Sequence, residues 1–106
     1  MGWDTLAQRH AEIISLLLHG EKYGFEIAKE YSKASGKELP LGSLYTTMDR
    51  LEAKGLVKSR LGEPNPERGG NRRRFYSITA EGRRAFTNFT EQSAALTTAL
   101  GGLANA

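Results

Sequence analysis

The chain has 106 residues, of which 39% are hydrophobic and 25% are charged, and this suits one globular domain with a single core. It contains no cysteine, which excludes disulfides, zinc sites built on thiolates and a cysteine nucleophile. No apolar run approaches the ~18 residues of a membrane span, and MGWDTLAQRH lacks the order of a secretion signal. We therefore expect a soluble cytoplasmic protein with no membrane partner.

Charge is distributed unevenly along the chain. The segment from Lys58 to Arg84 holds eight basic and three acidic residues, a balance of +5, whereas the whole chain carries only +3. Such asymmetry favours a local anion-binding surface on an otherwise neutral body. A merely solvated face is the alternative, but it would more often interleave Glu with Arg.

The first half of the chain predicts two short helices. Over 3–19, apolar residues spaced by three and four define one helical face, Thr5 and Gln8 match a capping box, and Gly20 is placed to end the helix. Over 23–35 a second helix is expected to end at Gly36, with an inward face of Ile27, Ala28 and Tyr31.

LGSLYTTMDRLEAKG, from residue 41 to Gly55, predicts a third helix with two distinct faces. Leu44, Met48 and Leu51 share a narrow arc that must face the core. The opposite side carries hydroxyls and cations without a carboxylate: Ser43, Thr46, Thr47, Arg50 and Lys54. The acidic residues Asp49 and Glu52 lie off that side, beside Tyr45.

Residues 56–61 and 74–79 predict two strands, joined by a loop rich in Gly, Pro, Asn and Arg. The stretch PERGGNRRRFYSIT places Arg72, Arg73 and Arg74 together at this hairpin, where Gly69 and Gly70 permit a bend. Cations this close require full solvation or an anionic partner. Since side chains alternate along a strand, we expect Arg72 and Arg74 to face opposite to Arg73.

The last helix follows Thr79, which is expected to cap it, and carries a heptad-like series of Phe86, Phe89, Ser93, Leu96, Leu100 and Leu103. Gly101 and Gly102 are expected to fray its end. The series can pack on its own domain or on a second copy, and we favour the second copy because so small a domain leaves little surface to cover. The predicted dimer interface comprises Trp3, Ala7, His10, Ile14, Phe86, Phe89, Ser93, Leu96 and Leu100.

The fold class predicted from this order is mainly α with a small β-hairpin: a winged helix-turn-helix of three helices and a two-stranded wing over 1–79, followed by a C-terminal dimerisation helix over 80–106. YGFEIAKEY, LGSLYTTMDRLEAKGLV and GGNRRRFYSITAEGRRAF, within residues 10–90, resemble the PadR family of bacterial transcriptional regulators. The resemblance implies a homodimeric, repressor-like regulator that binds double-stranded DNA.

A helix with a polar face free of carboxylates can enter the major groove, which is about 12 Å wide. Arg50 can form two hydrogen bonds with guanine. Thr46 and Thr47 can contact base edges, or they are simply solvated. Ser43 can bind a phosphate, act as an N-cap, or do both. Lys22 and Tyr23 resemble the family's backbone-contacting pair, with packing an equal alternative for Tyr23. The predicted DNA-binding set is Lys22, Tyr23, Ser43, Tyr45, Thr46, Thr47, Arg50, Lys54, Arg68, Asn71, Arg72, Arg73 and Arg74.

Three other functions would require different residues in the sequence. His10 and His19 lack matching carboxylates, and no phosphate loop, nucleophile elbow or metal-ligand spacing is present, so we expect no enzyme, metal or cofactor. The resemblance allows a sensor of a small aromatic effector, with Trp3, Phe86 and Phe89 near the dimer interface, although an ordinary apolar interface is the simpler interpretation. A winged helix for protein or RNA would predict a neutral or acidic third helix and wing.

Overall fold

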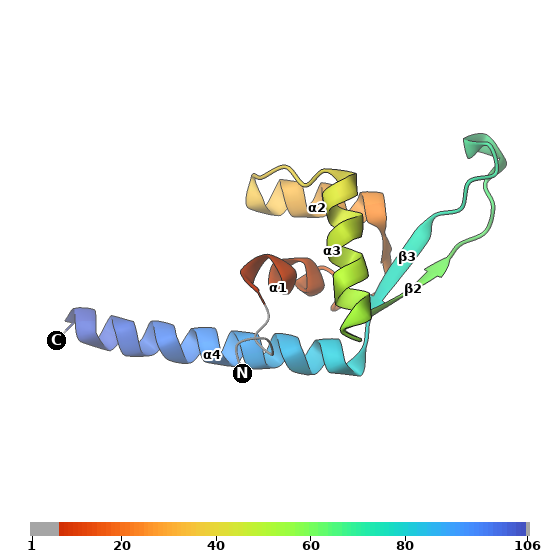
Figure 1. The fold of residues 1–106 in the computed structure, drawn as a ribbon. Coiled ribbons are helices and arrows are strands. Elements are labelled where there is room, and N and C mark those ends of the chain that lie inside the picture. Colours follow the sequence, from red (N-terminus) through yellow and green to blue (C-terminus); the bar gives the residue numbers. More distant parts are fainter. Residues whose placement is uncertain (1–6, 106) are drawn as a thin grey trace.

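The structure is a computed structural model that describes residues 7–105. Its elements are, in chain order, α1 (Gln8–Ser15), β1 (Lys22–Tyr23), α2 (Gly24–Ser35), α3 (Leu41–Ala53), β2 (Val57–Leu61), a 3-10 helix (Pro66–Arg68), β3 (Arg74–Ile78) and α4 (Ala80–Asn105). In Figure 1, α1, α2 and α3 form a cluster, the β2–β3 hairpin projects away from it, and α4 runs below α1 and extends beyond it. The fold is therefore a mainly helical winged helix-turn-helix, as the order of elements predicted.

The hydrophobic core lies where the first three helices meet the base of the sheet. On α3, Leu44, Met48 and Leu51 are completely buried, which confirms the core face predicted from their spacing. The inward face predicted for α2 is also buried: Ile27, Ala28 and Tyr31. Because burying one large apolar side chain is worth about 1.5–3 kcal/mol, these two faces fix how α2 and α3 pack.

The first helix is shorter than the sequence predicted. It begins at Gln8 and ends at Ser15, and residues 3–6, including Thr5 of the expected capping box, lie outside the described residues. After Ser15 the backbone bonds tighten, so that the Leu17 N–H donates to the carbonyl of Ile14 at 2.9 Å. Gly20 therefore ends this turn rather than the helix, and Leu17 reaches the core with only 1% of its surface exposed.

The sheet has three strands where the sequence predicted two. Its order is β1-β3-β2, and both pairings are antiparallel. The additional strand, β1, has two residues, with Lys22 opposite Tyr76 and Tyr23 opposite Phe75. A strand this short shows no alternation in the sequence, and it exists because Tyr23 is extended just before α2 begins.

A single threonine joins the start of α4 to the end of α3. The Thr79 hydroxyl accepts a hydrogen bond from the Gly82 N–H at 3.0 Å, which confirms the predicted cap. The same hydroxyl donates to the Gly55 carbonyl at 2.6 Å, and the Thr79 N–H donates to the Leu56 carbonyl at 3.1 Å. We call these contacts the Thr79 junction. A Cβ on Gly82 would lie 2.1 Å from the Leu56 carbonyl oxygen, so the junction closes only with glycine there.

Helix α4 is continuous for 26 residues, and Gly101 and Gly102 do not fray it as expected. Glycine lowers helix propensity without breaking the backbone hydrogen bonds. Phe86 and Phe89 are partly buried against the core, whereas every described side chain between Thr90 and Ala99 is exposed. The radius of gyration is 16.2 Å, against about 13 Å for a compact chain of this length, because the second half of α4 projects beyond the domain (Figure 1).

Within residues 7–105, no helix combines the length and apolarity needed to cross a membrane.

We predict that Gly82→Ala destabilises the fold by about 1–3 kcal/mol, because its methyl group would overlap backbone atoms that cannot move aside cheaply. Urea unfolding measures the change. Gly42→Ala on α3 is the matched control: nothing lies within 4 Å of its Cβ, and it should gain up to about 1 kcal/mol from helix propensity. Equal stability of the two variants would show that the Thr79 junction is not closely packed.

Candidate nucleic-acid interface

The outward side of α3 carries most of the polar residues that the sequence placed there. Ser43, Thr46, Arg50 and Lys54 are exposed, and Thr47 is half-buried. The Thr46 hydroxyl donates to the Gly42 carbonyl at 3.0 Å, which leaves its oxygen free to accept. Within residues 7–105, neither Arg50 nor Lys54 takes part in an ion pair. This side of α3 therefore offers cations and hydroxyl groups to a partner.

The two carboxylates of α3 behave differently. Glu52 accepts hydrogen bonds from the Ser59 N–H at 3.2 Å and from the Ser59 hydroxyl at 2.9 Å, so it is engaged with β2. Asp49 is exposed. Glu52 thus helps to hold the hairpin against α3.

The side chains of Arg73 and Arg74 diverge, as the alternation along a strand predicted. The guanidinium of Arg73 lies over the ring of Tyr23, 4.2 Å from its centroid. Arg74 instead donates from Nη1 to the Ser59 hydroxyl at 3.1 Å, on the side where Ser59 meets Glu52. The chain from Arg74 through Ser59 to Glu52 fastens the hairpin to α3. Within the described part of the chain, the Arg72 side chain makes no hydrogen bond or ion pair.

Several other basic residues are already paired. Arg60 donates from Nε to Glu21 at 3.1 Å and forms an ion pair with it, while its guanidinium carbon lies 4.6 Å from the centroid of Phe75. The hydrogen bond from Arg60 lowers the pKa of Glu21 and raises the pKa of Arg60. Lys22 forms an ion pair with Glu30 at 3.1 Å. A count of basic residues in the sequence therefore overstates the cations available to an external anion.

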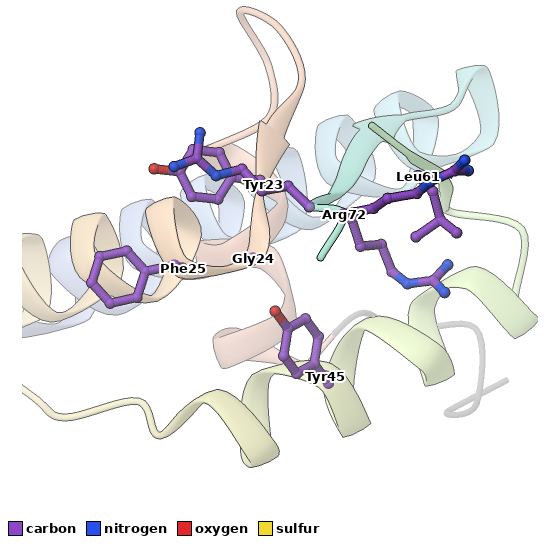
Figure 2. Close-up of a pocket in the computed structure, with 8 residues that line it drawn as sticks. Tyr23, Gly24, Phe25, Tyr45, Leu61 and Arg72 are labelled. Carbon is purple, nitrogen blue, oxygen red and sulfur yellow. The ribbon is translucent and has the colours of Figure 1, made fainter. Parts of the chain in front are cut away.

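The start of α2, α3 and the hairpin surround one open groove of about 700 Å³. It is lined by Tyr23, Gly24 and Phe25, by Tyr45, and by Leu61 and residues 72–74 of the hairpin (Figure 2). We call it the wing groove, and the segment 57–78 the wing. Among the described residues, no carboxylate lines the wing groove. Its cations come from the wing, and α3 contributes the Tyr45 side chain to the same opening.

Two of the predicted residues lie at the far end of the wing. The loop there forms a 3-10 helix in which the Asn65 side chain accepts from the Glu67 N–H at 2.9 Å. Gly69 and Gly70 both have left-handed φ angles, of 69° and 82°, which confirms their expected role in the bend. Asn71 is exposed, and the side chain of Arg68 is outside the described part of the structure.

Three residues that line the wing groove were not predicted from the sequence: Gly24, Phe25 and Leu61. Gly24 is buried, and a Cβ on it would lie 2.7 Å from the Tyr45 ring, so this glycine allows Tyr45 to lie against the start of α2. Phe25 and Leu61 are 56% and 49% exposed. Their positions in the sequence could have indicated exposure, because Phe25 falls outside the apolar face of α2 and Leu61 is the last residue of its strand.

The residues predicted for self-association divide into three groups. Ala7, Ser93 and Leu96 are exposed, Leu96 by 60%. Phe86, Phe89 and His10 are partly buried by their own domain. Ile14 is completely buried in the core, so it has no surface for a second chain. Trp3 and the side chain of Leu100 lie outside what the structure describes.

His10 is half-buried on α1, and its Nδ1 has no hydrogen-bond partner among the described residues. Burial lowers the pKa of His10, and the positive charges of Lys54 and Arg50 lower it further. A lower pKa favours the neutral form of this ring at neutral pH.

The chain is similar to known transcriptional regulators in sequence and in fold. The model of the transcriptional regulator PadR-like family matches residues 13–88. A transcriptional regulator from Clostridium thermocellum is 30% identical, with a TM-score of 0.71 over 87% of this chain and 85% of that one. The structure of Bacillus subtilis PadR in complex with operator DNA has a TM-score of 0.66 at 18% identity, over 76% of this chain and 46% of that one, and it shows the same fold.

A curated relative, "Uncharacterized protein X" from Lysinibacillus sphaericus, is 30% identical over 73 residues. The match covers 67% of this chain and 64% of that relative, so it spans less than two thirds of the relative's length. The family match covers most of the chain and includes both α3 and the wing. The chain therefore belongs to the PadR-like family of transcriptional regulators.

Tyr76 of β3 belongs to the hydrophobic core and is completely buried, and its hydroxyl has no hydrogen-bond partner among the described residues. Burial raises the pKa of Tyr76 to about 12. Because the fold holds this proton more tightly than the unfolded chain does, the stabilisation is present below pH ~10 and is lost as the pH rises towards 12.

We predict that Tyr76→Phe does not lower stability at neutral pH and reduces the loss of stability above pH ~10, as measured by urea unfolding across that range. Tyr31→Phe is the matched control, because the Tyr31 hydroxyl does have a partner and donates to Glu12 at 3.2 Å. It should cost about 1 kcal/mol. A larger loss for Tyr76→Phe than for Tyr31→Phe would contradict the unpaired state of the Tyr76 hydroxyl.

Proposed function

We propose that the chain is a sequence-specific regulator of transcription that binds double-stranded DNA as a homodimer and acts as a repressor. The observation that carries this proposal is the opening between Tyr45 of α3 and the three arginines of the wing, with no carboxylate among the described residues that line it. The likeness in fold to Bacillus subtilis PadR, a protein captured with operator DNA, supports it.

In this proposal α3 enters the major groove, which is about 12 Å wide and admits one helix. Arg50 is exposed and unpaired among the described residues, so its fork is free to bond O6 and N7 of guanine. Thr46 keeps an acceptor for base edges, and Ser43 and Lys54 flank it as phosphate contacts. Thr47, being half-buried, contributes less surface.

The wing supplies contacts to the DNA backbone. Arg72 is the arginine with the greatest freedom, while Arg73 and Arg74 reach phosphates from positions already set by Tyr23 and Ser59. Tyr23 and Tyr45 line the same opening, and Lys22 lies next to Tyr23 with part of its charge balanced by Glu30. Arg68 and Asn71 extend this set along the loop.

The homodimer would form through residues 80–106, leaving residues 1–79 to bind DNA. The exposed second half of α4 offers an unoccupied face with Leu96 at its centre, and Phe86, Phe89, Ser93 and Leu100 continue the same helical spacing. Trp3, Ala7 and His10 would complete the interface from the N-terminal side. Two subunits related by a two-fold axis would contact half-sites about one helical turn apart, and a bound dimer would block access to the promoter.

We predict that Arg72→Ala weakens binding to every duplex and lowers the slope of log affinity against log salt by roughly 0.9, the value for one lost phosphate contact. Arg50→Ala should instead reduce the preference among sequences, by about 1–3 kcal/mol at one base pair. Fluorescence anisotropy with a selected duplex and scrambled duplexes, at several salt concentrations, measures both effects.

Arg60→Ala is the control for net charge, because it removes the same charge from the wing at a position where Glu21 already pairs with it. Its salt slope should stay close to that of the unmodified chain. Equal slopes for Arg72→Ala and Arg60→Ala would mean that the wing acts only through its total charge, and unchanged sequence preference in Arg50→Ala would remove Arg50 from base recognition.

For the homodimer, we predict that Leu96→Glu weakens self-association at least about tenfold, because a carboxylate would be buried without a partner. Sedimentation velocity over a range of concentrations measures this. Thr98→Glu is the matched control, since Thr98 is exposed on the other side of α4. A monomeric unmodified chain at micromolar concentration, or equal effects of the two variants, would contradict pairing through this face.

A further inference from the structure

The wing groove contains two large apolar side chains that the proposed contacts of α3 and the arginines leave unexplained. Phe25 is 56% exposed and Leu61 is 49% exposed, although side chains of this kind are usually buried. Figure 2 shows them on opposite sides of the opening, with Phe25 on α2 and Leu61 at the end of β2. Whatever occupies the groove therefore meets apolar surface on two sides.

Three guanidinium groups accompany this apolar surface. Arg72, Arg73 and Arg74 all line the groove, and none of the other described lining residues is a carboxylate. Apolar and cationic surfaces side by side match the backbone of a nucleic acid, in which sugars alternate with phosphates. A polyanion is favoured over a small organic anion, because a single carboxylate would leave most of the charge of these arginines uncompensated.

Tyr45 of α3 also lines the groove, and its position depends on Gly24. A Cβ on Gly24 would lie 2.7 Å from the hydroxyl oxygen of Tyr45. The Tyr45 ring therefore lies directly on the start of α2, with its hydroxyl directed towards Gly24 (Figure 2). This arrangement leaves an open space of about 700 Å³ between α3 and the wing.

We propose that the wing groove holds a stretch of the sugar–phosphate backbone of one DNA strand, with Phe25 and Leu61 packed against deoxyribose rings and Arg72, Arg73 and Arg74 facing the phosphates. The proposal rests on the proposed function and adds two contact residues that carry no charge. Contacts to sugar and phosphate position a protein on the duplex without selecting its sequence.

The test uses the full chain and a duplex that it selects from a random pool. Phe25→Ala and Leu61→Ala should each weaken binding roughly fivefold, on selected and scrambled duplexes alike, through the loss of apolar contact area. Neither variant should change the salt dependence, because no counterion release is lost. Phe25→Leu, which keeps an apolar side chain, should recover most of the affinity, and thermal unfolding should show that all three variants fold as the unmodified chain does.

Hydroxyl-radical footprinting gives a second measurement, because the radical attacks exposed deoxyribose. The unmodified chain should protect several consecutive sugars of one strand, and Phe25→Ala should restore cleavage there while leaving other protection intact. Unchanged affinity and protection in both alanine variants would overturn this proposal, even if Arg72→Ala still weakens binding. Failure of the unmodified chain to select any duplex would overturn the proposed function itself.

Discussion

The Thr79 junction fixes how α4 is placed relative to α3. One hydroxyl accepts from the Gly82 N–H of α4 and donates to the Gly55 carbonyl, directly after α3. Gly82 has no room for a side chain against the Leu56 carbonyl, so α4 begins in close contact with the segment that follows α3. In the proposed homodimer, α4 carries the interface and α3 reads the DNA. The junction would then set how the two recognition helices are spaced.

The wing is a positioned set of cations rather than a loose basic loop. Arg73 is held on Tyr23, Arg74 is tied through Ser59 to α3, and Arg60 is paired with Glu21. A guanidinium that is already oriented loses less side-chain freedom when it meets a phosphate. Arg72 keeps more conformational freedom than these three arginines. In the proposed complex, the positioned guanidinium groups would allow a chain of modest total charge to bind phosphates.

Helical periodicity led to the most accurate predictions from the sequence. The core faces of α2 and α3 were predicted correctly because burial at every third and fourth position is a local property of a helix. The Thr79 cap followed from local chemistry, and the alternation of Arg73 and Arg74 followed from strand geometry. The extent of α1 was wrong because a tighter turn after Ser15 brings Leu17 into the core, and only the packed neighbours select that turn.

The sequence by itself determined the class of fold, the family and the helix with a polar face free of carboxylates, because each depends on residue type and spacing. Only the tertiary structure decided which arginines are already engaged, since their partners Glu21, Tyr23 and Ser59 are far away in the chain. It also decided that Phe25 and Leu61 share one groove, because the packing of α2 against the wing is a long-range contact that no local pattern encodes.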